Sequence, residues 1–138
     1  MVGFNRGRLA LAGVGVLALL TATSALAVFP HISTDLTGPA IGGVVPRGTA
    51  EVDQTQFPGT LDLRLSKVNL PDGTVLTVIM TDCLQDSVGT ITINKQRARA
   101  SILLPSEPSV CQVGHNSSIF LRLGETTVLQ GGAPWQVR

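Results

Sequence analysis

Apolar and polar residues alternate with a period of two along most of the chain from Arg47 onward. The clearest case is the run in which Leu61, Leu63 and Leu65 are separated by polar neighbours. This period places alternate side chains on opposite faces of an extended backbone, which is typical of a half-buried β-strand. The pattern predicts strands near residues 50–55, 61–66, 75–80, 88–94, 98–104, 117–123 and 126–130.

The breaks between these strands carry turn signals. After Lys67 the apolar phase moves to Val68 and Leu70, which is the change that a β-bulge makes in one strand. Residues 71–74, Pro-Asp-Gly-Thr, have the composition of a tight turn. About seven short strands in residues 47–131 predict an all-β fold, namely an antiparallel two-layer β-sandwich of the immunoglobulin-like kind. A small closed barrel is the alternative, because the pattern does not decide closure.

The N-terminus has the layout of a secretory signal peptide. Arg6 and Arg8 precede an apolar run at residues 9–20, and Ala-Leu-Ala follows at residues 25–27. A membrane anchor is the competing interpretation, but a spanning helix needs about 20 apolar residues and this run is shorter. We therefore expect a signal helix at residues 1–27 that is removed after Ala27, and a secreted or periplasmic protein without a membrane span.

The rest of the chain divides into two predicted parts. Residues 28–46 contain three prolines and three glycines without a sustained period, so we interpret them as an irregular arm or linker with one short strand at residues 41–45. Residues 47–138 are the predicted β-domain.

Composition narrows the functional classes. The 138 residues are 43% hydrophobic and 14% charged, with a net charge of +1. Without the predicted leader, eight basic and nine acidic residues remain, which is a net charge of −1. The hydrophobic fraction is too high for a disordered chain, and the charge does not indicate a nucleic-acid partner.

The two cysteines, Cys83 and Cys111, both follow the predicted leader. A cysteine pair in an exported protein usually forms a disulfide, because the compartment is oxidising. We expect a structural bridge between them.

A metal site is the alternative use of the same residues. Cys111 and His115 are four residues apart, a spacing found in the ligand loop of blue-copper proteins, and His31 could supply a second imidazole. No methionine follows His115, so the usual axial ligand is missing, and Cys83 is the better partner for Cys111. We therefore predict no metal or other cofactor, with a small copper- or zinc-binding protein as the alternative.

Catalytic motifs are weak. The chain has no Gly-x-Ser-x-Gly element, and Asp82 and Asp86 lie in a loop where acids usually form turns. We predict no catalytic residue and no enzyme.

The only run of charge is Lys95, Arg97 and Arg99 on the predicted outer face of one strand. It indicates either a small stripe for anions or polysaccharides, or an edge strand protected by positive charge against pairing with other sheets. Few aromatic residues are present, so sugar recognition by ring stacking is disfavoured, and Trp135 is expected to cap the open end of the core.

A resemblance rests on three motifs: Leu-x-Leu-x-Leu at residues 61–65, Asn-Leu-Pro-Asp-Gly-Thr-Val-Leu at residues 69–76, and Val-Gly-Thr-Ile at residues 88–91. Over residues 48–131 the chain resembles bacterial exported all-β domains of uncharacterised function, with immunoglobulin-like or chordin-type sandwiches among them. The His-x-His element of chordin-type domains is missing here. The resemblance implies fold and export but no active site. We expect an exported, non-catalytic module for binding, adhesion or envelope structure, with an unidentified protein or envelope partner.

Overall fold

The computed structural model describes residues 31–83, 87–105, 111, 113–114 and 116–138. Within these residues it contains nine β-strands and no helix, so none that could span a bilayer is found there. The predicted signal helix at residues 1–27 lies outside the described residues. The strands are β1 (His31–Thr37), β2 (Arg47–Asp53), β3 (Thr60–Ser66), β4 (Val75–Met80), β5 (Gly89–Thr92), β6 (Ala98–Leu103), β7 (Ser118–Leu123), β8 (Thr126–Gly132) and β9 (Gln136–Val137).

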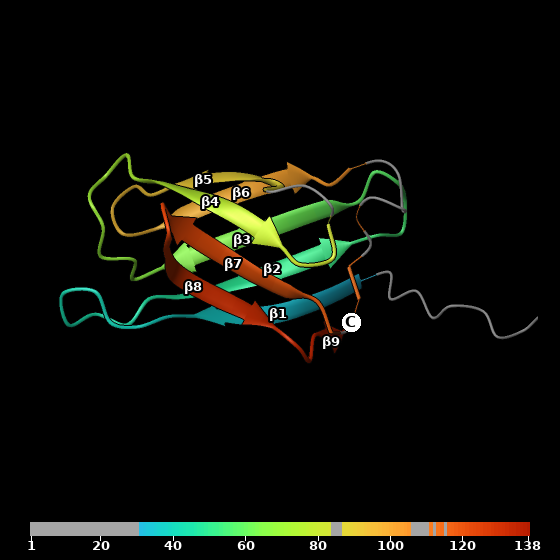
Figure 1. Cartoon of the computed structure of the whole chain (residues 1–138), viewed down its shortest axis with the longest axis horizontal. Helices are drawn as coiled ribbons and strands as arrows, with labels where there is room; N and C mark the ends of the chain where they lie inside the picture. The colour runs from blue at the N-terminus through green and yellow to red at the C-terminus, as the bar shows by residue number, and fades with distance from the viewer. Residues whose placement is uncertain (1–30, 84–86, 106–110, 112, 115) are drawn as a thin grey trace, which may run out of the picture.

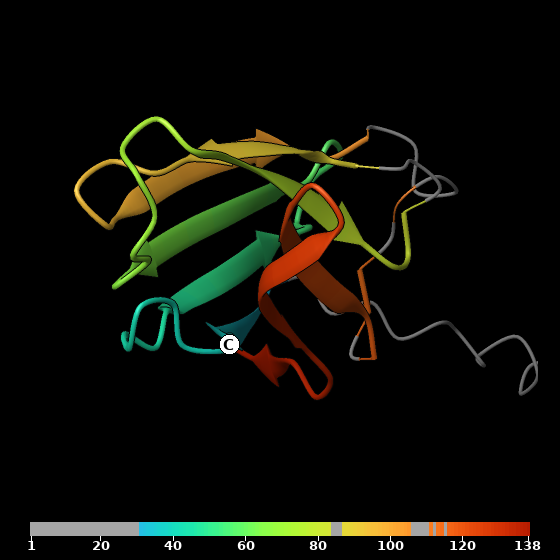
Figure 2. The same cartoon turned by 60° about the vertical axis from the view of Figure 1, so that its left-hand side comes forward.

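All the strands belong to one antiparallel sheet with the order β5-β4-β7-β8-β1-β2-β3-β6, and β9 pairs with β1 (Figure 1). The sheet curls until its two end strands meet, as the turned view shows (Figure 2). A Cβ atom placed on Gly89 of β5 would lie 2.9 Å from Cδ1 of Ile102 in β6, so the two ends are in side-chain contact.

The predicted all-β antiparallel architecture is therefore confirmed, in the form of a nearly closed barrel. The continuous sheet is closer to the barrel alternative than to two separately hydrogen-bonded layers. The shortest strand pairing in this sheet is between β1 and β8, where only Thr37 and Gln130 are in register.

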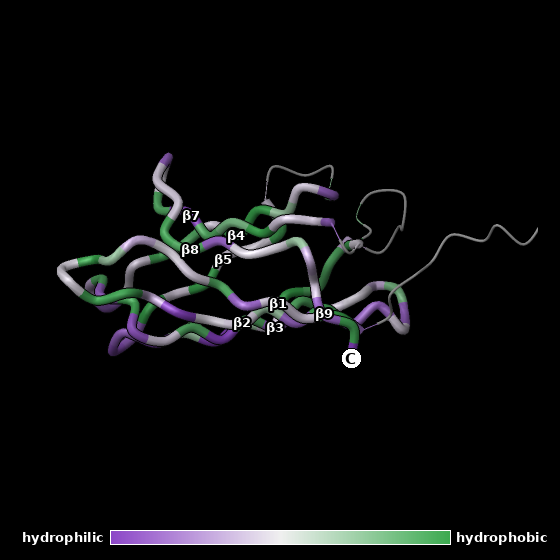
Figure 3. Tube along the Cα trace, turned by 90° about the horizontal axis from the view of Figure 1, so that it is seen from below, coloured by the Kyte–Doolittle hydropathy of each residue, from purple (hydrophilic) through white to green (hydrophobic). Residues whose placement is uncertain are grey.

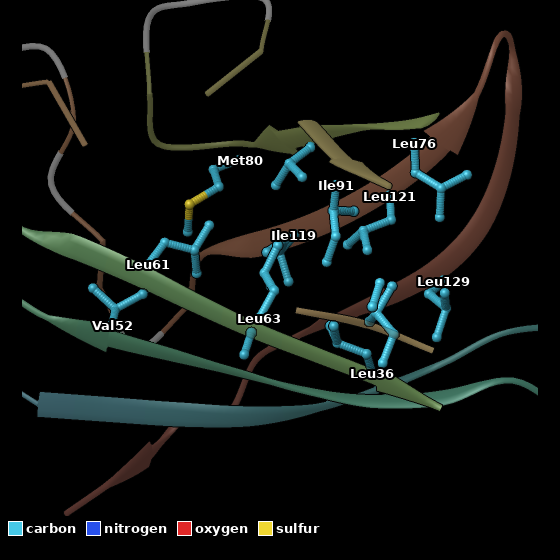
Figure 4. Packing of buried hydrophobic residues seen from close by; sticks show 14 of the residues in the cluster. Leu36, Val52, Leu61, Leu63, Leu76, Met80, Ile91, Ile119, Leu121 and Leu129 are labelled. Carbon is cyan, nitrogen blue, oxygen red and sulfur yellow. The ribbon is translucent and has the colours of Figure 1, made fainter. Parts of the chain in front are cut away.

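The core fills the space between the two halves of the barrel (Figure 4). Side chains of β2 and β3, such as Val52 and Leu63, point toward those of β4 and β7, such as Met80 and Ile119. All four are 0–1% exposed. They occupy the inward positions of the period-two pattern, so the alternation along the sequence determines which face is buried.

The prediction of an irregular arm at residues 28–46 is wrong for residues 31–37, and residues 28–30 lie outside the described part of the chain. Residues His31–Thr37 form β1, which pairs with the whole of β2 from His31 opposite Asp53 to Thr37 opposite Arg47. Ile32 and Leu36 are buried in the core. The segment has only these two aliphatic side chains, so pairing with β2, and not its own pattern, makes it a strand. The short strand expected at residues 41–45 is a tight turn closed by hydrogen bonds between Ile41 and Val44.

The phase change after β3 occurs at Lys67, whose φ of 57° is left-handed. The chain then turns so that Val68 is fully buried and its amide donates to the carbonyl of Gln96 at 3.0 Å. This carbonyl belongs to the two-residue turn between Asn94 and Arg97, in which Lys95 and Gln96 also have left-handed φ values of 53° and 62°. Two consecutive left-handed residues define a type I′ turn, which favours Asn-Gly.

This turn gives a first prediction. The double variant Lys95→Asn/Gln96→Gly raises the free energy of unfolding by about 1 kcal/mol, because a left-handed backbone is unfavourable for lysine and glutamine. Chemical denaturation measures the difference, and Lys95→Asn alone, which keeps Gln96, gives a smaller gain. A loss of stability in the double variant would contradict the turn geometry.

Candidate functional site: an arginine groove

An open groove of about 780 Å³ crosses the outer face of β1, β2, β3 and β6. The outward positions of these strands are polar. Figure 3, which colours the chain by hydropathy, shows purple hydrophilic stretches between green ones in this part of the sheet. We call this surface the arginine groove. Eight outward side chains line it: Asp35, Thr37, Arg47, Thr49, Arg64, Ser66, Arg97 and Arg99.

Strand register brings these side chains together from four separate parts of the sequence. Arg64 of β3 lies directly opposite Arg99 of β6. On the other side of Arg64, the same row continues to Thr49 of β2 and then to Asp35 of β1. Two arginines are therefore cross-strand neighbours, with a hydroxyl beside them and a carboxylate at the far end of the row.

A second row runs beside the first. Arg47 of β2 lies opposite Thr37 of β1 on one side and Ser66 of β3 on the other. Arg97 precedes the first residue of β6 and extends the same row. Neighbouring strands are about 4.8 Å apart, so Arg47 and Arg97, two strands apart, are separated by roughly 10 Å along the groove.

The four arginines are exposed, and none has a carboxylate within ion-pair distance among the residues that the structure describes. Like charges directly opposite each other in a sheet are destabilising, by a few tenths of a kcal/mol to about 1 kcal/mol. The Arg64–Arg99 pair therefore lowers the stability of the fold unless an anion lies between the two guanidinium groups.

Most of the cations beyond residue 30 lie at this end of the barrel, together with Asp35 in the groove lining and Asp72, which accepts a hydrogen bond from the Lys95 amide at 2.7 Å. Beyond residue 30 the chain has eight lysines and arginines, and six of them are the four groove arginines with Lys67 and Lys95. Lys67 follows β3 and Lys95 lies in the turn before β6, so both are beside the groove at the same end of the strands. Both lysines also have backbone φ angles in the left-handed region, and such strained backbone often occurs at functional sites.

Acidic residues occupy the other end of the same outer face. Glu51 lies opposite Asp62 and forms an ion pair with Arg138 at 3.4 Å. Asp53 accepts hydrogen bonds from the Thr55 hydroxyl at 2.7 Å and the Thr55 amide at 2.9 Å, and these bonds hold the pKa of its carboxyl below the usual value. The face is therefore divided into a basic end and an acidic end.

The end of the barrel opposite the groove contains the disulfide. Cys83, beyond β4, is bonded to Cys111, ahead of β7, which confirms the predicted bridge. Nearby, the buried Gln54 side chain donates to the carbonyl of Val113 at 2.8 Å and accepts from its amide at 3.0 Å. These contacts attach the segment around Cys111 to the end of β2, so this region is structural.

Asp82, one of the two acids considered for catalysis, belongs to the same region. Asp82 accepts a hydrogen bond from the hydroxyl of Ser117, which in turn accepts one from the amide of Gly114 at 2.8 Å. Trp135 is fully buried, and its indole nitrogen donates to the carbonyl of Ser117 at 2.7 Å. Asp82 thus stabilises the start of β7, while Asp86 lies outside the described residues.

The alternative metal site loses its thiolates, because both cysteines are in the disulfide. His31 lies opposite Asp53 at the acidic end, and His115 is outside the described residues. Among the residues that the structure does describe, no three histidine, cysteine or acidic side chains are grouped as metal ligands.

Sequence reasoning found Lys95, Arg97 and Arg99 but missed Arg47 and Arg64. Each of these two is a single cation on a polar strand face, and only the register β2-β3-β6 joins them to the others. The alternation places both residues on the outward face of their strands and could have been used as a signal. The order of the strands in the sheet cannot be obtained from the alternation.

Comparisons with family models, curated proteins and solved structures found no match to this chain, so the resemblance to exported all-β domains stays a prediction.

Proposed function

We propose that this chain is a non-catalytic binding module that works outside the cytoplasm and holds an anionic ligand in the arginine groove. The observation that carries the proposal is the direct opposition of Arg64 and Arg99 in a groove with two further arginines, where no carboxylate of the described residues is within ion-pair distance of the four. Such a surface is unfavourable without a ligand and becomes favourable when an anion lies between the guanidinium groups.

Export is supported by two independent features. The first 27 residues have the basic, apolar and Ala-x-Ala order of a signal peptide. The Cys83–Cys111 disulfide is typical of proteins from oxidising compartments. Together they favour a secreted or periplasmic protein that meets ligands of the envelope or its surroundings.

A binding role is favoured over catalysis by what the groove offers. Its charged groups are mainly arginines, whose guanidinium groups hold anions through charge and hydrogen bonds. The groove is also open, and it lies at the opposite end of the barrel from Asp82 and Ser117.

The immunoglobulin-like sandwich stays part of the proposal. The single residue pair between β1 and β8 supports a description in which the two halves of the barrel act as two layers. In either description, the outer face of β1-β2-β3-β6 presents the groove to solvent.

The proposal is tested with a panel of three anionic polymers: polygalacturonate, polyglutamate and inorganic polyphosphate. We expect the full chain to bind at least one of them, with affinity that falls as salt rises. The variant Arg64→Ser/Arg99→Ser weakens this binding and leaves the free energy of unfolding unchanged or raised by up to about 1 kcal/mol, because the like-charge pair is removed.

The matched control is Arg122→Ser/Arg138→Ser, which removes two arginines outside the groove and the same net charge. Titration calorimetry of all three proteins gives the comparison. The proposal fails if the full chain binds none of the polymers, or if the control variant loses as much affinity as the groove variant.

A further inference from the structure

The position of the arginines sets the shape of the ligand. They occupy two adjacent rows that run across β2, β3 and β6, from Arg47 to the Arg97 and Arg99 side chains at the edge strand. In the next row Glu51 and Asp62 are paired, so a polyanion is repelled from the remainder of the face. An anionic ligand therefore lies across the strands, close to their basic end, and does not run along them.

The length of this track suits a ligand with more than one negative charge. The backbones at Arg47 and Arg97 are roughly 10 Å apart, whereas a single small anion is contacted by guanidinium groups that converge on one point. Asp35 lies at the β1 end of the Arg64–Arg99 row and blocks extension in that direction. In the other direction the row ends at Arg99 of β6, the last strand in the hydrogen-bonded order.

The groups beside the arginines indicate the chemistry of the ligand. Three hydroxyl side chains share the two rows: Ser66 lies between Arg47 and Arg97, Thr37 lies beyond Arg47, and Thr49 lies beside Arg64. Hydroxyl groups donate and accept hydrogen bonds, so they suit a ligand that carries hydroxyls as well as charges. None of the residues that line the groove is aromatic, so it offers no surface on which nucleic-acid bases could stack.

These observations rest on the proposed function and make its ligand specific. We infer that the arginine groove binds an acidic polysaccharide, whose carboxylates pair with the arginines while its hydroxyls bond to Thr37, Thr49 and Ser66. Arginine suits this role because its planar fork can hold both oxygens of a carboxylate. Lys67 and Lys95 add positive charge on the side of the groove away from Glu51 and Asp62.

The test compares ligands that differ in one property at a time. Polygalacturonate is the probe, and its methyl ester removes the charge but keeps the sugar backbone. Polyglutamate keeps carboxylates without sugar hydroxyls, and single-stranded poly(dT) supplies charge with bases. We expect the full chain to bind polygalacturonate most tightly and the methyl ester not detectably.

Variants locate the two kinds of contact. Arg64→Ser/Arg99→Ser weakens polygalacturonate binding by about 30-fold, as expected for two charge-assisted contacts at a solvent-exposed surface. Thr49→Val weakens polygalacturonate but leaves polyglutamate binding unchanged, because only the sugar uses the hydroxyl. The control Arg122→Ser/Arg138→Ser stays within about twofold, since neither arginine lines the groove and charge effects over longer distances are screened by salt.

The outcomes separate the two proposals. If polyglutamate or poly(dT) binds as tightly as polygalacturonate and depends on Arg64 and Arg99, the polysaccharide inference is overturned while the anion-binding function stands. If no anionic polymer binds, or the groove variant binds all of them as the full chain does, both are overturned.

Discussion

Replacing Leu121 with alanine is expected to lower the free energy of unfolding by about 3 to 5 kcal/mol. Leu121 is fully buried in the middle of β7, opposite Val78 of β4 on one side and Leu129 of β8 on the other. Both partners are also fully buried, so the shortened side chain leaves a cavity that its neighbours cannot fill without moving strands. Denaturant unfolding followed by circular dichroism measures the loss.

The control lies two residues further along the same strand. Leu123 is 43% exposed, and Leu123→Ala removes the same atoms from a position that is already partly in water. Its expected cost is below about 1 kcal/mol, because little apolar surface is buried there. Equal losses for the two variants would contradict the burial of Leu121 in the core and the exposure of Leu123 at the end of β7.

Removing the disulfide has the second large effect. Cys83 and Cys111 are 28 residues apart, and the bridge restricts the unfolded chain, so Cys83→Ser/Cys111→Ser lowers the free energy of unfolding by about 3 to 4 kcal/mol in the chain-entropy view. This loss is a large fraction of the roughly 5 to 15 kcal/mol that stabilises a typical domain. Thermal and denaturant unfolding of the two proteins give the difference.

Reductant provides the internal check. Intact mass rises by two hydrogens when the original protein is reduced, and its stability falls to that of the serine variant, whereas the variant itself is unaffected. The protein is unfolded in the presence of reductant so that the sulfur atoms are accessible. An unchanged mass and unchanged stability of the unsubstituted protein after this treatment would contradict the presence of the disulfide.

Most of the strands from Arg47 onward were predictable because they carry their own alternation. Leu61, Leu63 and Leu65 mark the inward face of β3 without reference to any other part of the chain. By contrast, β1 has only Ile32 and Leu36, and it becomes a strand because β2 pairs with it along its full length. The short β9 at residues 136–137 was missed for the same reason, since its pairing with β1 gives it no pattern of its own.

The arginine groove could likewise be predicted only in part, because it depends on which strands are neighbours in the sheet. Arg97 and Arg99 were visible as a run, but the run alone fits an edge strand equally well. The edge position of β6 confirms one part of that interpretation, because β6 ends the sheet order. The position of Arg64 opposite Arg99 favours the anion-binding interpretation over the edge-strand interpretation. This cross-strand pair depends on the register between β3 and β6, which the periodicity of the sequence does not contain.

The most direct test of the arginine groove is an amide chemical-shift titration of the full chain with short polygalacturonate oligomers. The account predicts saturable shifts at the four strand segments that line the groove, residues 35–37, 47–49, 64–66 and 97–99, and none at the disulfide end of the barrel. Shifts centred on the region around Cys83 and Cys111, or no shifts at low salt, would contradict it.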